Sequence, residues 1–359
     1  MKLLEALISY RKVPENLIEN DIVLFENAIQ ESIEAVKLLT LRDVNVSSEG
    51  LIFKGFTIFK ESFRDFSYPS YVKSVKFNLT FLVKNYFHKK KKIFKEDYYV
   101  WITDEISYTY FHWLADALPR LFATLQVIEK PKIILPYSFK KNKFIEESLK
   151  VFPVLELMFI KNNEVYNFNK LLLPTHVAKS GNYNDCIMKE IRQKYRSYYL
   201  EKQTLFLGEK IYISRAKATR RKILNEQELT DLLKEYGFTP VVFEDFSFDE
   251  QVSIVFNAKY LVSNHGAGLT NMLFMEAGTS VFELRREGDK HNNCYFSLAS
   301  ALDIKYYYQN CKTETDNTDS ILQLDSEPTM EEWESFTFAN IIIDLKKIKE
   351  NLNHMLNLS

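Results

Sequence analysis

Short apolar runs alternate with amphipathic stretches through the second half of the chain. Strand-like runs are expected at residues 210–214, 239–244, 259–264 and 279–284. The stretches between them carry apolar residues at helical spacing, and they predict helices at residues 225–237, 247–257 and 269–277. Short strands that alternate with single helices are typical of a parallel, doubly wound α/β sheet.

The first half follows a less regular pattern. Strands are expected at residues 51–59, 98–103, 132–135 and 170–173. Residues 111–130 are apolar at helical spacing, but Pro119 interrupts them and predicts a kinked helix or two short ones. A further helix is expected at residues 187–202, and the chain ends in a strand and an amphipathic helix capped by Asp344.

Length and pattern together predict two domains. A chain of 359 residues exceeds what one ordinary core supports. The boundary is expected after residue 205, so that the first domain covers residues 1–205 and the second covers residues 206–340. Residues 341–359 are expected to form a terminal strand and helix.

Charge and cysteine usage narrow the class of protein. The chain carries 47 basic and 48 acidic residues, and this balance argues against a dedicated nucleic-acid binder. Its three cysteines are widely spaced and form no ligand motif, so neither a disulfide framework nor a zinc site is expected. The first 21 residues are too charged for a signal peptide, and no run of about 18 apolar residues occurs. A cytoplasmic location is therefore expected.

A glycine-containing turn carries the first chemical signal. The chain has nine glycines, and Gly266, Gly268 and Gly278 fall within residues 263–284. The first two follow a predicted strand and His265, where the start of a helix offers free amide groups and a positive dipole end to a phosphate. The alternative is a tight turn whose glycines only allow packing. The predicted phosphate-binding residues are His265, Gly266, Ala267, Gly268, Leu269, Thr270 and Asn271.

A basic stretch follows another predicted strand. Ser214 and Arg215 stand at its end, and Arg220 and Arg221 come shortly afterwards. Arginine binds phosphate oxygens through two parallel hydrogen bonds, so such a cluster can hold a diphosphate. The alternative is a solvated basic loop.

The third candidate lies on the helix predicted in the first half. His112 and Asp116 are four residues apart and share one helix face, which suits a general base and its orienting partner. The alternative is a buried hydrogen bond that holds the helix. Glu283 and Gln251 are weaker candidates for the nucleoside, and Glu283 could equally be a surface residue. The run Lys89, Lys90, Lys91 and Lys92 is a solvated loop, or it contacts an anionic membrane surface or an acidic glycan.

The three candidates stand inside blocks that resemble glycosyltransferase family 61. YTYFHWLADALPRL resembles that family's HW..D.LPRL block, and KIYISRAKATRRKILNEQEL resembles its arginine block. The segment that contains HGAGLTN resembles its most diagnostic block. The order and spacing agree as well, over the chain from about residue 98 onward.

The resemblance implies a GT-B fold, in which two Rossmann-like domains face each other across a cleft. The first domain would bind the acceptor, the second would bind the nucleotide sugar, and residues 341–359 would be able to cross back to the first. It implies an inverting transfer to a hydroxyl, with Asp116 as the first choice of base and His112 as the second. A bacterial role in capsule or lipopolysaccharide synthesis is expected, at the inner face of the cytoplasmic membrane.

The donor is expected to be a UDP-linked sugar, with a glycan or lipid-linked glycan as acceptor and no cofactor. Metal independence is expected because the only DxxD-like loop, at Asp316 and Asp319, has unsuitable neighbours. The alternative function is a non-catalytic nucleotide- or glycan-binding protein on the same fold. A pyruvyl transferase of polysaccharide assembly fits the HGAGLTN block less well.

Overall fold

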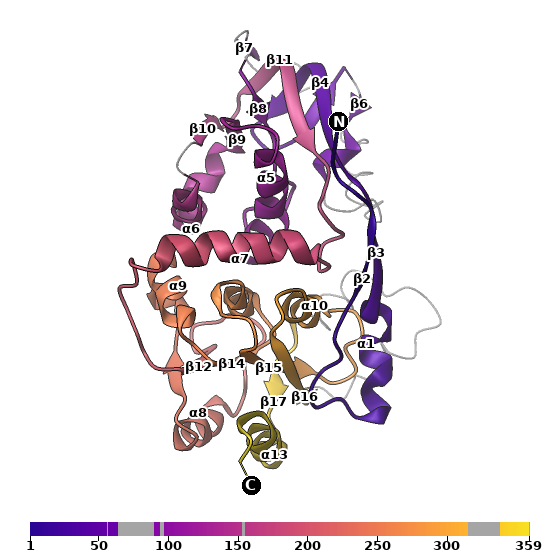
Figure 1. The fold of residues 1–359 in the computed structure, drawn as a ribbon. Helices are drawn as coiled ribbons and strands as arrows, with labels where there is room; N and C mark the ends of the chain where they lie inside the picture. Colours follow the sequence, from indigo (N-terminus) through magenta and orange to yellow (C-terminus); the bar gives the residue numbers. More distant parts are fainter. Residues whose placement is uncertain (56, 64–89, 94–96, 153–154, 315–337, 359) are drawn as a thin grey trace. The chain divides into compact units, whose positions relative to one another are not determined.

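The chain forms two compact units, each built on its own β-sheet, in a computed structural model (Figure 1). The structure describes all residues except 56, 64–89, 94–96, 153–154, 315–337 and 359. The first unit holds Met1–Ile8 and Ser32–Ile187, and the second holds Ser9–Glu31 and Met188–Ser359. Compact units are not always independent folding domains, so the expected boundaries at residues 205 and 340 stay a prediction.

The first unit contains a mixed sheet. Its order in the described residues is β10-β9-β8-β11-β4-β5-β6, with β1 beside β4 and β7 beside β11. The strands are β1 (Lys2–Leu4), β4 (Val36–Ser47), β5 (Ile52–Lys54), β6 (Thr57–Ile58), β7 (Lys90–Ile93), β8 (Tyr99–Val100), β9 (Lys132–Pro136), β10 (Glu156–Ile160) and β11 (Val165–Pro174). The pairs β10-β9, β9-β8, β8-β11 and β7-β11 are parallel, whereas β4 runs antiparallel to β11. This half is therefore α/β but only partly parallel.

The helix expected at residues 111–130 is interrupted before the proline rather than at it. It consists of α4 (Tyr110–His112), a π-helical turn η3 (Trp113–Ala117) and α5 (Leu118–Leu125). Pro119 stands in the first turn of α5, where a missing N–H group is tolerated. The wider π turn precedes it and lies within the His112–Asp116 segment. Such turns often occur at functional positions.

The remaining helices of the first unit are short, and they are η2 (Lys60–Ser62), η4 (Tyr137–Lys141), α6 (Lys143–Ser148) and η5 (Leu149–Val151). The indole N–H of buried Trp113 donates to Ser148 Oγ over 2.7 Å, which fastens η3 to α6. Separately, β2 (Leu7–Tyr10) and β3 (Gln30–Ile33) form a two-stranded sheet.

The second unit contains the parallel sheet that the sequence predicts. Its order in the described residues is β13-β12-β14-β15-β16-β17. The strands are β12 (Lys210–Ile213), β13 (Thr239–Val241), β14 (Tyr260–Asn264), β15 (Ser280–Arg286), β16 (Lys305–Thr313) and β17 (Ile341–Ile342). Only the β16-β17 pair is antiparallel. Because β12 and β14 are parallel neighbours, their carboxyl ends meet at one edge of the sheet.

The helices of the second unit largely follow their predicted signals. They are η1 (Glu19–Asp21), α1 (Ile22–Ile29), α7 (Asp185–Tyr199), α8 (Glu226–Glu235), η6 (Phe243–Asp245), α9 (Phe248–Phe256), η7 (Ala267–Phe274), α10 (Cys294–Ala301) and α13 (Leu345–Leu356), with the first residues of α7 in the first unit. Ser247 and Glu250 form the capping box predicted for α9. The α-helix expected at residues 269–277 is instead the 3-10 helix η7.

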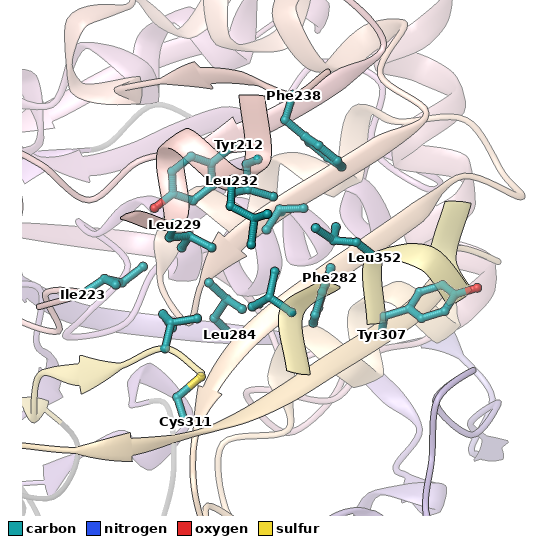
Figure 2. Packing of buried hydrophobic residues seen from close by; sticks show 14 of the residues in the cluster. Tyr212, Ile223, Leu229, Leu232, Phe238, Phe282, Leu284, Tyr307, Cys311 and Leu352 are labelled. Carbon is teal, nitrogen blue, oxygen red and sulfur yellow. The ribbon is translucent and has the colours of Figure 1, made fainter. Parts of the chain in front are cut away.

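The core of the second unit includes both ends of its chain. Figure 2 shows Leu352 of α13 beside Phe282 and Tyr307, and the buried residues Ile348 and Met355 complete the apolar stripe. The described partners of this stripe lie in the second unit, on α8 and β16 among others. Near the other end of the chain, the Phe25 ring of α1 lies 5.0 Å from the Phe296 ring and 4.9 Å from the Tyr308 ring. Among the described residues, no helix is both long enough and apolar enough to span a bilayer.

Candidate functional site

The glycine loop follows β14, and two side chains press against it. An added Cβ atom would lie 3.1 Å from Arg215 Nη1 at Gly266 and 3.1 Å from Ile213 Cγ2 at Gly268. The backbone at Gly266 is extended, with φ 168° and ψ 170°, which any residue can adopt. Glycine is therefore required here by close approach rather than by a left-handed backbone.

A glutamate that the sequence analysis missed organises the arginine loop. Glu226 Oε1, in the first turn of α8, accepts from the Tyr212 hydroxyl and the Ser214 hydroxyl, each over 2.8 Å, and from the Arg215 N–H over 2.7 Å. Ser214 is thereby engaged in holding the loop. The only sequence signal was the position of Glu226 within the NEQE stretch of the arginine block.

Arg215 is directed at the glycine loop and is partly buried. Its Nη2 donates to the carbonyl of Arg220 over 2.9 Å, whereas its Nε is buried and has no hydrogen-bond partner among the described residues. Burial lowers the pKa of Arg215, Arg221 lowers it further, and Glu244 opposes the change. A buried guanidinium N–H without a partner costs free energy, and an anionic oxygen would relieve that cost.

The two other arginines have a different placement. The guanidinium carbons of Arg220 and Arg221 lie 4.3 Å and 5.3 Å from the centre of the Phe338 ring. The Asn264 side-chain amide, at the end of β14, donates to the Arg221 carbonyl over 2.7 Å. The Asn264 side chain thus ties the end of β14 to the backbone of the arginine loop, and Arg215 is the arginine shown against the glycine loop.

Glu283 is completely buried in β15, and this placement does not fit the predicted ribose contact. Its Oε1 bonds Nδ1 of His265, and its Oε2 accepts from the Tyr306 hydroxyl. The His265 ring also packs edge-on against Tyr295, with 5.0 Å between ring centres. Glu283 therefore orients His265. Its position follows from the β14-β15 register, which sets Ser263 beside Glu283 and which the sequence analysis did not define.

Gln251 contacts the glycine loop but is largely engaged elsewhere. Its amide donates to the carbonyls of Phe243 and Phe246 over 2.9 and 3.0 Å, and its Oε1 lies 3.5 Å from Asn271 Nδ2. Asn271 in turn donates to the Gly268 carbonyl over 3.1 Å. Leu269, Thr270 and Asn271 are all buried. Their side chains support the loop, so any contact with a phosphate here would come from backbone amides.

His112 and Asp116 form the predicted pair in the first unit. His112 Nδ1 lies 2.6 Å from Asp116 Oδ2, and the Ser180 hydroxyl donates to the same oxygen over 2.8 Å. The Asp116 side chain is only 4% exposed, whereas that of His112 is 18% exposed. The imidazole is therefore the group of this pair that a substrate can reach. Ser180 carried no sequence signal, because its contact depends on the loop after β11.

The predicted lysine run and the two loop aspartates contribute nothing to this site within the described residues. Lys89 lies outside the described residues, while Lys90, Lys91 and Lys92 stand on β7, and the Lys91 ammonium lies 5.2 Å from the Tyr166 ring centre. Asp316 and Asp319 also lie outside the described residues.

A cavity of about 750 Å³ opens near the amino-terminal ends of β14 and β15, at the sheet edge opposite to the glycine loop. The part of the chain that the structure describes has no group of three or more His, Cys, Asp or Glu side chains suited to a metal ion.

An α/β protein with arginine and glycine loops at adjacent parallel strand ends has the layout of a phosphate-binding protein. Residues 110–282, just under half of the chain, match the family model described as Glycosyltransferase 61. This segment includes the His112–Asp116 pair, the arginine loop and the glycine loop.

The similar proteins are animal glycosyltransferases. The chain is 37% identical over 91 residues to the EGF domain-specific O-linked N-acetylglucosamine transferase of Bos taurus, which is 24% of this chain and 17% of that protein. It is 33% identical over 121 residues to the Drosophila melanogaster protein of the same name, covering 33% and 20%. It is 36% identical over 107 residues to protein O-linked-mannose beta-1,4-N-acetylglucosaminyltransferase 2 of Mus musculus, covering 28% and 18%. Each match thus spans a small part of the relative.

Proposed function

We propose that this protein is an inverting glycosyltransferase that moves a sugar from a nucleotide-sugar donor to a hydroxyl group of a glycan acceptor. The observation that carries the proposal is the placement of Arg215. Its Nη1 stands at Gly266, and its buried Nε has no hydrogen-bond partner among the described residues. Both loops lie within the matched glycosyltransferase 61 segment. This arrangement supplies fixed positive charge beside backbone amides, as a leaving diphosphate requires.

The donor diphosphate is proposed to lie between Arg215, His265 and the backbone of residues 266–271. Arg215 would neutralise the charge that develops on the leaving phosphate. Because His265 Nδ1 bonds the Glu283 carboxylate, its other ring nitrogen, Nε2, is the atom available to a ligand. With Nδ1–H bonded to Glu283, Nε2 would donate to a phosphate oxygen from a ring that carries two protons.

The base is proposed to be His112, which reverses the order of preference drawn from the sequence. Asp116 is almost fully buried, and its Oδ2 already accepts from His112 and Ser180. With the Nδ1–H of His112 donated to Asp116, the lone pair on Nε2 can take the proton of the acceptor hydroxyl. The oxygen then attacks the anomeric carbon, and the bond to the nucleoside diphosphate breaks. The GT-B arrangement expected from the resemblance stays a prediction.

N-acetylglucosamine is proposed as the first donor sugar to test. The names of the bovine, fly and mouse relatives all specify transfer of N-acetylglucosamine. The expected nucleotide is UDP, and no cofactor or metal is invoked. The acceptors in those names, EGF domains and O-linked mannose, belong to those proteins. A surface polysaccharide acceptor, a cytoplasmic location and a membrane contact through Lys90, Lys91 and Lys92 stay predictions.

The test is release of the nucleoside diphosphate by the purified full chain. A panel of nucleotide sugars that includes UDP-N-acetylglucosamine would be incubated with the protein, with and without simple glycosides as acceptors. Release that exceeds the rate of the Arg215→Ala variant supports a transferase. Saturable binding of a nucleotide sugar without any turnover would instead support the alternative of a binding protein.

A further inference from the structure

The first unit contains a second histidine–carboxylate pair, which the sequence analysis did not single out. His176 Nε2 lies 3.1 Å from Asp104 Oδ2. Asp104 Oδ1 also accepts from the Ser107 hydroxyl over 2.7 Å and from the Ile106 N–H over 3.1 Å. Although burial alone would raise it, the bonds from His176 and Ser107 hold the pKa of Asp104 well below its usual range. Asp104 is therefore an ionised acceptor in this pair.

The second pair lies beyond the carboxyl ends of two neighbouring strands, and one loop joins it to the first pair. Asp104 follows β8 and His176 follows β11, which are parallel neighbours with Val100 opposite Leu172. The loop after β11 serves both pairs, because it provides His176 to Asp104 and Ser180 to Asp116. The fold thus gathers two imidazole rings and their carboxylates around one loop.

A fully buried arginine connects the two pairs. Arg120 donates to the Pro174 carbonyl through Nε over 3.0 Å and through Nη2 over 2.6 Å, and to the Thr103 carbonyl through Nη1 over 3.3 Å. These bonds hold the chain at the carboxyl ends of β8 and β11. Burial lowers the pKa of Arg120 to about 10, and the charges of Asp104 and Asp116 oppose that change. Arg120 therefore places one positive charge near both carboxylates.

The hydrogen bonds fix which ring nitrogen each histidine presents. His176 gives its Nε2–H to Asp104, which leaves a lone pair on Nδ1. His112 gives its Nδ1–H to Asp116, which leaves a lone pair on Nε2. The side chain of His176 is 16% exposed and its carboxylate partner 1% exposed, which repeats the pattern of the first pair. Each pair buries the carboxylate and leaves part of the ring accessible.

We propose that His176 is an acceptor-binding residue, whose Nδ1 accepts a hydrogen bond from a second hydroxyl of the acceptor saccharide while His112 engages the attacking hydroxyl. Two ring nitrogens with lone pairs, whose carboxylate pairs share one loop, suit a ligand that carries several neighbouring hydroxyl groups. Asp104 and Arg120 act as positioning residues, because they set the tautomer of His176 and hold the strand ends. The inference rests on the proposed function and assigns a second contact on its acceptor side.

The first experiment follows the histidine rings directly. The full chain, labelled with ¹⁵N in its histidine side chains, would be titrated with methyl glycosides of glucose, galactose, mannose and N-acetylglucosamine. The neutral form of the His176 ring should carry its proton on Nε2 and not on Nδ1, and at least one glycoside should shift the His176 and His112 resonances together. A panel in which no glycoside shifts His176 at its highest soluble concentration would overturn the proposal.

Two substitutions separate ligand contact from a structural role. In His176→Asn the amide stands near the former Nδ1, so its oxygen can still accept from a saccharide. In His176→Gln the amide stands near the former Nε2, so it can still bond Asp104. The Kd of the responsive glycoside should rise about tenfold in the glutamine variant, which is the value of one ordinary hydrogen bond, and by less in the asparagine variant. The opposite order would show that His176 only supports Asp104.

The controls keep this inference distinct from the proposed function. His354→Asn changes a histidine on α13, near Tyr307, and should leave the glycoside Kd unchanged. Hydrolysis of the nucleotide sugar in the absence of glycoside should likewise be unchanged in His354→Asn. If the wild-type protein turns over no nucleotide sugar, the proposed function fails whatever the NMR result. If it does turn one over and His176 stays silent, only the acceptor contact fails.

Discussion

The imidazole of His265 is bonded to Glu283, a carboxylate with no exposure to solvent. The Tyr306 hydroxyl occupies the other oxygen of that carboxylate. A candidate phosphate-binding ring is thus fixed by a negative charge from inside the sheet. Carboxylates in this relation orient an imidazole ring.

Glu283→Gln should weaken donor binding, because the amide keeps the shape of the side chain but removes the negative charge that orients His265. We expect the Kd of UDP-N-acetylglucosamine at neutral pH to rise about tenfold, the scale of a hydrogen bond to a charged group. Calorimetric titration would measure it. Glu276→Gln, at an exposed partner of Arg196, is the matched control. Equal Kd values in Glu283→Gln and wild type would remove His265 from the phosphate site.

Arg215→Ala should reduce donor affinity more than the same change at its neighbours. Loss of a charged contact to phosphate corresponds to a rise in Kd of about 10- to 100-fold. Arg220→Ala should have a smaller effect, because Arg220 stacks on Phe338 and not on the glycine loop. The comparison uses the Kd of one nucleotide sugar for both variants. A larger loss in Arg220→Ala would contradict the assignment.

His112→Ala should lower turnover about 10²- to 10⁴-fold, as expected for the loss of a general base. Asp116→Asn should lower it as well, because an amide at that position no longer favours the required tautomer. Neither change should alter the Kd of the donor, since neither residue is among those proposed to bind the donor diphosphate. Single-turnover rates and donor titration together would check this. A variant of His112 with wild-type turnover would exclude it as the base.

Gly268→Ala should lower the stability of the protein, whereas Gly266→Ala should lower its affinity for the donor. At Gly268 the new methyl group meets Ile213 Cγ2 of a packed strand, and overpacking of this kind costs about 1–3 kcal/mol of stability. At Gly266 it meets the end of the Arg215 side chain, which can move. Gly266→Ala should therefore keep most of the stability and lose donor affinity. Denaturant unfolding and donor titration of both variants would reveal whether the two effects separate.

Asp289 should make the free energy of unfolding depend on pH in the acid range. Burial favours its neutral form, but Arg285 and His265 outweigh burial and lower the pKa of Asp289 from 3.8 to about 2. A lowered pKa stabilises the folded state above the unfolded value, so this contribution of about 2 kcal/mol is present above pH ~5 and disappears as the pH falls toward 2. Urea unfolding between pH 6 and 3 would show it. Asp289→Asn should give a flatter profile, and an equally steep one would contradict the assignment.

Local sequence patterns predicted much of the secondary structure of the second unit. The alternation of strands and helices predicted its parallel sheet, and Ser247 with Glu250 and Asp344 predicted two helix starts that the structure confirms. Gly237 follows α8 with φ +79°, as a glycine at a helix end does. These features depend on residues within a few positions of each other, so the sequence records them directly.

The catalytic candidates show what local sequence patterns could not predict, namely burial and contacts between residues far apart in the chain. The sequence predicted that His112 and Asp116 are neighbours, because residues four positions apart on a helix share a face. It could not show that Asp116 is buried, that Ser180 reaches it, or that His176 and Asp104 form a second pair. Ser180 and His176 are separated from their partners by 64 and 72 residues.

The sequence by itself therefore determined the kinds of elements and the residue types at the ends of the strands. Only the tertiary structure decided which of those residues meet, because strand register and side-chain packing join positions far apart in the chain. Glu283 illustrates the difference. The sequence left it as a surface residue or a ribose contact, whereas the β14-β15 register buries it beneath His265 and makes it a positioning residue.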